Sequence, residues 1–263
     1  MDVERLLDLA PGLSVWNPAT HEYALVGPWR HRPDIVHAVE LVSIRHPVEL
    51  MRFAIDRAIQ AGSRLFLALE MTERRQTSFY GEVGLQIMEN VLSYELHSGR
   101  SAARTKPDVD IHRIEQLSDL ELNVLTNVDH DAFPWLWRNS VAEFREYFAQ
   151  AGVEMFVLRE LGTTVAYLGI TSFPSWGHID RVAVMGSKQG NGLGTLLTNF
   201  AIDRLIALGA ARIGLSTQQR NVRSQTMYER LGFRRQVSSD YRIYGRVLWQ
   251  NDSIDDLVMG QQA

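Results

Sequence analysis

Apolar residues in the second half of the chain recur with either a two-residue or a 3.6-residue period, and these periods predict its strands and helices. Strands are predicted at residues 109–114, 155–158, 163–172, 177–184 and 212–216. Helices are predicted at residues 117–125, 140–150, 193–208 and 222–231. The third helix has the clearest pattern, because apolar side chains recur at i, i+3, i+4, i+7 and i+8 from Leu193 and Gly209 follows as a C-terminal cap. Residues 173–176 predict a hairpin turn, and residue 237 with 241–248 predicts a terminal antiparallel pair.

The first half repeats this order in a shorter form. Strand-like runs at 23–27 and 35–44 precede an amphipathic helix at 47–61, which is followed by Gly62 and a strand at 64–70. Tyr80 then precedes Gly84 by the same spacing as Tyr228 precedes Gly232. Between the halves, residues 98–107 are small and polar without apolar periodicity, which is typical of a linker. The sequence therefore predicts a first domain at 1–97, a linker at 98–107, a second domain at 108–250 and a tail at 251–263.

Composition narrows the function class. The chain has 263 residues, a net charge of −4 and no cysteine, so disulfides, thiolate nucleophiles and Cys-based zinc sites are excluded. Nucleic acid and anionic lipid are not expected as partners, because neither half carries a basic excess. The polar N-terminus and the absence of a long apolar run predict a cytoplasmic protein without a membrane partner. The oligomeric state stays open, with a homodimer as one candidate.

A glycine-rich loop at 189–194 separates the strand 177–184 from the clearest helix. Glycines let backbone N–H groups turn inward, and the N-terminus of a helix adds the positive end of its dipole, so the loop predicts a pyrophosphate site. No Gly-Lys-Ser/Thr follows the loop, and Thr195 stands where a dinucleotide fingerprint needs a third glycine. A nucleotide triphosphatase and a Rossmann dehydrogenase are therefore disfavoured.

Two motifs in order resemble the GNAT superfamily of acetyl-CoA-dependent N-acetyltransferases. The first is Gln/Arg-x-x-Gly-x-Gly/Ala, which Gln189, Gly192 and Gly194 match. The second is the later Asn…Tyr…Gly-Phe helix, matched by Asn221, Ser224, Tyr228, Gly232 and Phe233. The resemblance covers about residues 108–250. It implies an α/β fold of GNAT type: a mixed β-sheet, flanked by helices and splayed between the strands at 177–184 and 211–216.

The resemblance also implies where acetyl-CoA would bind. The pantetheine arm would lie in the splay like an added strand, and the loop would hold the pyrophosphate. The implied cofactor-binding residues are Val182, Ala183, Val184, Gln189, Gly190, Asn191, Gly192, Leu193, Gly194, Thr195, Asn221, Ser224 and Tyr228. Lys188, Arg220 and Arg223 could meet further phosphates, although a solvated surface charge explains each of them as well. No metal is expected; the histidines at 21, 31, 37 and 46 lack metal-ligand spacing.

Acetylation of an amine requires its neutral form, so a base is needed. An alkylamine of pKa ~10.4 lies roughly 4 kcal/mol from reactivity at pH 7. Strict alternation places Trp176, His178, Asp180, Val182 and Val184 on one strand face, which makes Asp180 and His178 the candidate bases, with Asp180 slightly favoured. The alternatives are a salt bridge from Asp180 to Arg181 or Arg212, and a half-exposed strand end for His178.

Tyr228 stands at the tyrosine position of the family, which implies that it gives a proton to the leaving thiolate. The alternative is a half-buried helix tyrosine whose hydroxyl only finds a partner. Asn221 begins the same helix and can act as its N-cap, as a cofactor contact, or as both.

Aromatic residues mark the candidate acceptor side. Phe133, Trp135 and Trp137 lie between the first two helices of the second domain, and with Trp176 they suggest an apolar or aromatic acceptor. Packing against the first half explains the first three equally well.

The first half resembles a truncated GNAT-like domain. Where the second half has its glycine loop, the first has residues 42–47 without glycine, so cofactor binding is not expected there. The sequence as a whole predicts an acetyl-CoA-dependent N-acetyltransferase acting on a small primary amine by direct attack in a ternary complex. A protein or peptide N-acetyltransferase and a non-catalytic acyl-CoA sensor remain as alternatives.

Overall fold

The computed structural model describes residues 12–70, 76–97 and 109–249, and these form two compact units. Unit 1 contains residues up to Asn90 together with those from Tyr241 onward, and unit 2 contains Val91–Asp240. The predicted linker at 98–107 and tail at 251–263 lie outside the described residues. No helix in the described part of the chain is both long and apolar enough to cross a bilayer.

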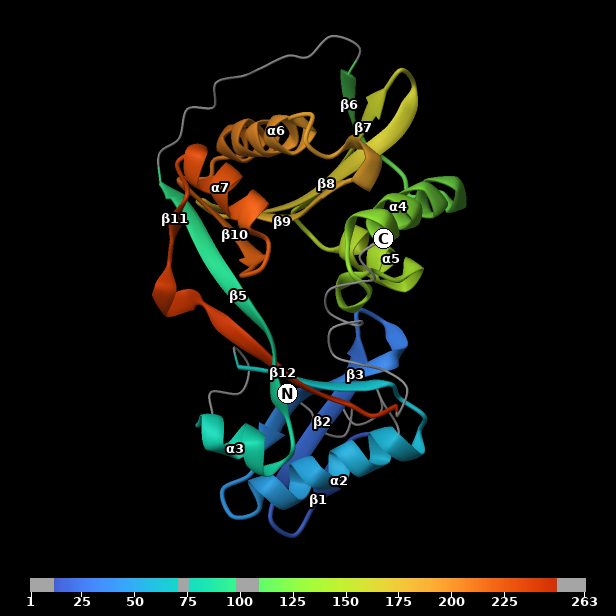
Figure 1. Ribbon diagram of the computed structural model, residues 1–263, viewed down its shortest axis with the longest axis vertical. Helices are drawn as coiled ribbons and strands as arrows, with labels where there is room; N and C mark the ends of the chain where they lie inside the picture. The colour runs from blue at the N-terminus through green and yellow to red at the C-terminus, as the bar shows by residue number, and fades with distance from the viewer. Residues whose placement is uncertain (1–11, 71–75, 98–108, 250–263) are drawn as a thin grey trace. The chain divides into compact units, whose positions relative to one another are not determined.

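Unit 2 is a mixed sheet with helices on both faces (Figure 1). Its strands are β5 (Gln86–His97, from Val91 on), β6 (Val109–Arg113), β7 (Val153–Glu160), β8 (Thr163–Phe173), β9 (Trp176–Val184), β10 (Arg212–Gln218) and the short β11 (Arg234–Arg235). Its helices are α4 (Asp119–Ala132), α5 (Val141–Ala149), α6 (Leu193–Ala207) and α7 (Val222–Arg230), with 3-10 turns η1 (Trp135–Trp137), η2 (Gly186–Lys188) and η3 (Val237–Ser239). The strand order is β5-β10-β9-β8-β7-β6.

The sheet of unit 2 is splayed between β9 and β10, as the sequence predicts. These parallel strands pair only from Trp176 and Arg212 to Ile179 and Leu215. Farther along, β10 stays paired with β5 as far as Gln218, and β9 stays paired with β8 as far as Val184. The two strands therefore part after Ile179, which leaves a backbone edge of β9 facing the gap.

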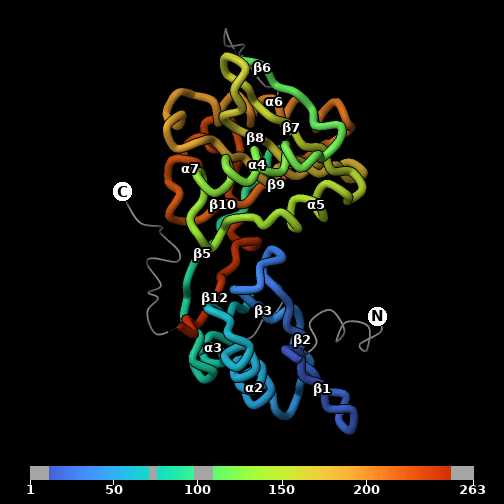
Figure 2. The backbone as a smooth tube through the Cα atoms, turned by 90° about the vertical axis from the view of Figure 1, so that its right-hand side faces the viewer, coloured from blue at the N-terminus to red at the C-terminus, as the bar shows by residue number. Residues whose placement is uncertain are grey.

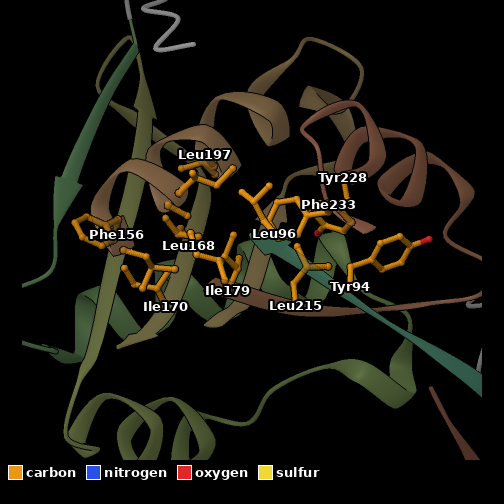
Figure 3. Packing of buried hydrophobic residues seen from close by; sticks show 14 of the residues in the cluster. Tyr94, Leu96, Phe156, Leu168, Ile170, Ile179, Leu197, Leu215, Tyr228 and Phe233 are labelled. Atoms are coloured by element: carbon orange, nitrogen blue, oxygen red, sulfur yellow. The ribbon is translucent and has the colours of Figure 1, made fainter. Parts of the chain in front are cut away.

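Two apolar clusters cover the two faces of this sheet. Helices α6 and α7 pack on one face, where Ile179, Leu197, Leu215 and Tyr228 share a core (Figure 3). Helices α4 and α5 pack on the other face, around Phe144, Tyr167 and Ala183. The sheet of unit 2 thus has a helical layer on either side (Figure 1).

Unit 1 repeats a parallel β-α-β arrangement on a smaller scale; the first part of its chain is drawn in blue to teal in Figure 2. Its strands are β1 (Val15–Asn17), β2 (Glu22–Trp29), β3 (Arg32–Val42), β4 (Leu65–Leu69), the first residues of β5 and β12 (Tyr241–Val247); its helices are α2 (Pro47–Gln60) and α3 (Thr77–Glu82). β3 and β4 are parallel and joined through α2, as β9 and β10 are joined through α6. The helical face of α2 buries Met51, Ala54, Ile55 and Ala58 against the strands.

The side chain of Glu22 on β2 forms hydrogen bonds with residues 43–45, the segment just before α2. The Oε1 atom of Glu22 accepts hydrogen bonds from the Ser43 hydroxyl at 2.7 Å and from the N–H groups of Ile44 and Arg45 at 3.0 Å each. The bond from the Arg45 N–H, followed by that from Ser43, lowers the pKa of Glu22 to about 2. The prediction that this segment binds no cofactor thereby gains a physical reason, since an ionised side chain already holds the N–H groups that a phosphate would need.

Two details of the predicted organisation are wrong. Residues 241–247 do not pair with the segment around Val237; β12 pairs with β4, and Val237 lies in a 3-10 turn. The limits of the units also differ from the predicted domains, because β5 contributes its first residues to unit 1 and its remainder to unit 2, while β12 belongs to unit 1. The reason is that each of these strands finds its partner far away in sequence.

Candidate functional site

The glycine-rich loop leads from η2 directly into the N-terminus of α6. Gly190 and Gly192 have φ angles of +85° and +80°, which side chains with a Cβ rarely adopt. Gly192 is the N-cap of α6 and no side chain caps this end, unlike α7, where Asn221 does so. The first N–H groups of a helix have no partner within it, so this end of α6 presents donors and a positive dipole to an anion. The loop thus has the geometry that its sequence predicts.

Of the cations near the loop, Arg223 is the best placed. A Cβ on Gly190 would lie 2.9 Å from Nη2 of Arg223, and Nη1 of Arg223 donates to Oε1 of Gln189 at 3.2 Å. Gln189 in turn donates through Nε2 to the Val184 carbonyl at 3.0 Å, which links the loop to the open edge of β9. Lys188 is paired with Glu160 at 2.6 Å and is therefore partly neutralised.

A β-bulge at Asp180 changes the predicted faces of β9. Ile179 pairs with Ile170 and Arg181 with Gly169, so Asp180 has no opposite residue on β8. Val182 and Val184 consequently pack toward the α6 face with Ile179, whereas Ala183 belongs to the cluster on the α4–α5 face. The prediction that His178 and Asp180 share a face with Val182 and Val184 is wrong, because one inserted residue reverses the alternation.

His178 and Asp180 lie in contact on the α5 side of the sheet. Nδ1 of His178 is 2.7 Å from Oδ1 of Asp180. The other carboxylate oxygen of Asp180 accepts from the hydroxyls of Tyr147 on α5 and Thr171 on β8, at 2.6 and 2.7 Å. The side chains of His178 and Asp180 are 27% and 26% exposed, so solvent reaches both. The salt bridge from Asp180 to Arg181 or Arg212, which was the alternative to a catalytic role, is not found among the described residues; Asp180 contacts these three side chains instead, and Arg181 pairs with Asp129.

Tyr147 and Thr171 were not predicted from the sequence. Tyr147 can reach Asp180 because it passes over Gly169 on β8, the partner of Arg181, where a Cβ would lie 2.8 Å from the Tyr147 hydroxyl. A glycine inside an apolar strand run is a recognised mark of close approach by another group, and this is the signal that the sequence offered. Burial, followed by the charge of Asp180, raises the pKa of Tyr147 well above its ordinary value, so its hydroxyl remains a proton donor.

Tyr228 lies in the core on the α6–α7 side. It is 8% exposed and packs against Tyr94 and Phe233, whose ring centroids are 6.3 and 5.9 Å away (Figure 3). Burial raises the pKa of Tyr228 to about 12, so the phenol is protonated at neutral pH. At the start of the same helix, Oδ1 of Asn221 accepts from the Ser224 N–H at 3.2 Å. Asn221 therefore acts as the N-cap, and its second predicted role, as a cofactor contact, stays a prediction.

The four predicted acceptor-side aromatics fall into two groups. Trp176 begins β9, stacks on Phe173 at 4.7 Å and lies beside His178 with a centroid distance of 5.8 Å. Phe133 packs against Arg181. Arg181 lies five residues after Trp176 on β9, or roughly 15 Å farther along the strand. Trp135 and Trp137 form η1 next to Phe133, and Trp137 is buried. The structure thus places Trp176 with the His178 network and the other three at the α4–α5 connection.

A buried ion pair holds that connection, and the sequence analysis missed it. Arg181 donates to Oδ2 of Asp129 at 2.6 and 2.7 Å, to the Tyr167 hydroxyl at 2.8 Å and to the Trp137 carbonyl at 2.6 Å. Its guanidinium lies 3.8 Å from the centroid of the Phe133 ring. Burial raises the pKa of Tyr167 far above its ordinary value, and Asp129 is fully buried. The available signal was that Asp129 follows Leu122 and Leu125 at the spacing of buried helix positions.

The acetyltransferase (GNAT) family pattern matches residues 114–233, which extend from five residues before α4 to three residues after α7 and include the loop, the splay and Tyr228. Residues 114–233 form a GNAT domain. The predicted resemblance and fold class are thereby confirmed. Comparison with curated proteins gave no match.

Solved GNAT structures share the fold of the chain. A GCN5-related N-acetyltransferase from Sphaerobacter thermophilus is 13% identical, with a TM-score of 0.65 over 95% of this chain and 87% of that chain. A tandem GNAT protein from the clavulanic acid biosynthesis pathway is also 13% identical, with a TM-score of 0.63 over 94% of this chain and 87% of that one. A GCN5-related N-acetyltransferase from Kribbella flavida is 17% identical, with a TM-score of 0.54 over 92% and 94%. Since these matches extend well beyond the GNAT domain, they include the fold of unit 1.

Proposed function

We propose that this protein transfers an acetyl group from acetyl-CoA to the primary amine of a small molecule, by direct attack in a ternary complex. The observation that carries the proposal is the gap between β9 and β10, which opens beside the uncapped N-terminus of α6. A free strand edge can pair with an extended amide-containing chain, and an uncapped helix N-terminus can bind phosphate. Coenzyme A carries both groups in one molecule.

The residues around the gap fit this cofactor. The backbone of Val182, Ala183 and Val184 would pair with the pantetheine amides, and the N–H groups from Gly190 to Thr195 would hold the pyrophosphate. Acetyl-CoA supplies the thioester carbonyl that the amine attacks and the sulfur that leaves. Tyr228 holds the proton that this sulfur needs. The net reaction converts an ammonium ion and the thioester into an amide, a free thiol and one released proton.

The α4–α5 connection supports a small acceptor. The ion pair of Arg181 and Asp129 fixes Phe133 and the η1 turn against β9. A wall fixed by buried bonds favours a compact amine over an extended peptide main chain. Aromatic side chains on this wall and at Trp176 favour amines with an apolar or aromatic body.

Turnover with an amine panel tests the proposal. The protein is incubated with acetyl-CoA and 2-phenylethylamine, tryptamine, or a short peptide with a free N-terminus, and the released thiol is measured. We expect thiol release with the arylalkylamines and a much slower rate with the peptide. Preference for the peptide would favour a protein N-acetyltransferase. Tight binding of coenzyme A in calorimetry without thiol release from any amine would favour an acyl-CoA sensor.

Substitution of Arg223 by glutamine is expected to weaken coenzyme A binding. Arg223 is the cation beside Gly190, and loss of one charge-assisted contact at an exposed site should raise the Kd roughly 3- to 10-fold at low salt. Lys188→Gln is the matched control, and a smaller effect is expected because Glu160 already pairs with Lys188. Calorimetric titration with coenzyme A measures both. Equal effects of the two substitutions would contradict the placement of Arg223 at the phosphates.

A further inference from the structure

The carboxylate of Asp180 is fully engaged by three donors. Oδ1 faces Nδ1 of His178, and Oδ2 accepts from the hydroxyls of Tyr147 and Thr171. A carboxylate that took a proton from a substrate would lose part of this network. An ionised carboxylate can only accept hydrogen bonds, so in this form Asp180 accepts from Tyr147, Thr171 and Nδ1 of His178.

Asp180 therefore fixes the tautomer of His178. Because the carboxylate accepts, Nδ1 of His178 carries the proton of the neutral ring, and Nε2 presents a lone pair. Among the described residues, no hydrogen bond occupies Nε2. This is the arrangement by which a buried or half-buried carboxylate orients an imidazole for general base catalysis.

A glycine on β10 makes room for the opposite edge of the imidazole. His178 pairs with Gly214 on β10, and a Cβ at position 214 would lie 3.3 Å from Cδ2 of His178, the ring atom next to Nε2. The strands β9 and β10 separate one residue later, after Ile179 and Leu215. The Nε2 edge thus lies at the point where the gap begins, on the face that carries Trp176.

We propose that His178 is the general base of the acetyl transfer, and that Asp180, clamped by Tyr147 and Thr171, is its positioning residue. This assignment rests on the proposed function. The acceptor ammonium gives one proton to Nε2 of His178 and keeps the lone pair on its nitrogen; the imidazolium then returns this proton to water. Asp180 bears no proton at any step and stabilises the imidazolium by its charge.

The charged and titratable groups around His178 come from several elements. Asp180 lies on β9, Tyr147 on α5 and Arg212 on β10, where the Arg212 guanidinium is 5.9 Å from the Trp176 ring. Arg212 is itself 3.7 Å from Glu95 on β5. Asp180 is the one charged group among these in direct contact with the ring.

The tautomer can be measured without any activity. Long-range ¹H–¹⁵N NMR spectra of the full chain above pH 8 distinguish an Nδ1–H from an Nε2–H imidazole, and His178→Gln assigns the signal. We expect an Nδ1–H tautomer in the wild type. In Asp180→Asn, the amide oxygen should face Tyr147 and Thr171, which turns the NH₂ group toward Nδ1 and shifts the ring to Nε2–H. A wild-type Nε2–H tautomer would overturn the proposal.

The kinetic experiment uses the amine that gives the fastest thiol release with the wild-type protein. His178→Gln is expected to lower kcat/KM about 100-fold, since base catalysis contributes factors of this size. It should also remove the acidic limb of the pH profile, which is the fall of kcat/KM at low pH. Asp180→Asn should have a similar effect, whereas Tyr147→Phe and Thr171→Val should lower kcat/KM roughly 3- to 10-fold and keep the acidic limb. His112→Gln, an exposed histidine on β6, is the control that should change nothing.

The outcomes separate the two proposals. A wild-type protein that binds coenzyme A but acetylates no amine would contradict the proposed function, and the base assignment with it. Turnover in the wild type with an unchanged pH profile in His178→Gln would overturn the base assignment alone. Far-UV circular dichroism checks that each variant is folded, and the wild-type NMR measurement decides the tautomer even where a variant is not.

Discussion

Replacement of Tyr228 by phenylalanine is expected to lower kcat for acetyl transfer about 100-fold or more, because the leaving sulfur then lacks its proton donor. The substitution removes one oxygen from a side chain that otherwise stays packed between Tyr94 and Phe233. Burial raises the pKa of this phenol to about 12. The expected loss is therefore chemical and not structural, and steady-state thiol release measures it.

Tyr94→Phe is the matched control for Tyr228→Phe. Tyr94 belongs to the same core (Figure 3), and its hydroxyl donates to Glu229 at 3.3 Å. Its loss should leave kcat nearly unchanged. The wild type should also show no basic decline of kcat from Tyr228 below about pH 10, since an acid with a pKa of about 12 stays protonated there. Equal kcat values for the wild type and Tyr228→Phe would show that Tyr228 has only a packing role.

The glycine loop could be predicted from the sequence because its requirements are local. Gly190 and Gly192 need left-handed backbone angles, and α6 needs an apolar stripe that begins at Leu193; both are visible within a few residues. The same holds for the cap of α7 by Asn221. These features make up the cofactor side of the candidate site.

The acceptor side depends on pairings that a single strand does not reveal. The sequence of residues 176–184 predicts side chains that alternate regularly between the two faces of a strand. The bulge at Asp180 arises only from the register of β9 against β8. The bulge decides which groups face α5, and so it decides which residue can serve as base. Alternation placed His178 and Asp180 on one face without choosing between them, and the slight preference for Asp180 came from the family resemblance. In the structure the carboxylate of Asp180 contacts His178, Tyr147 and Thr171.

Long-range pairing also set the limits of the units. The Arg242 N–H donates to Glu70 across 172 positions, where β12 meets β4. Alternation in residues 241–247 indicates a strand but contains no information about its partner, and the nearest strand in sequence was the wrong choice. The repeat of helix, glycine and strand was nonetheless visible, because α2 and α6 each connect two parallel strands.

Replacement of Asp129 by alanine is expected to lower the free energy of unfolding by about 3–5 kcal/mol, which is typical when one partner of a buried ion pair is removed. Asp129 is fully buried, and Arg181 would keep its charge in a site that excludes water. Removal of the carboxylate also releases the Asn139 N–H, which donates to it at 2.8 Å. Thermal and urea unfolding followed by circular dichroism measure the loss, with a fall in Tm of roughly 10 °C.

Two further variants isolate the cause of the Asp129→Ala effect. Asp119→Ala, on the same helix, breaks an exposed pair with Arg145 at 2.8 Å and should cost only a small fraction of that loss, because solvent screens it. The double variant Asp129→Leu, Arg181→Met removes both buried charges and should recover most of the stability, since no uncompensated ion remains. Two results would contradict this account: a loss of stability in Asp129→Ala as small as that in Asp119→Ala, or a double variant less stable than Asp129→Ala. Either would show that the ion pair does not hold Phe133 and the η1 turn on β9.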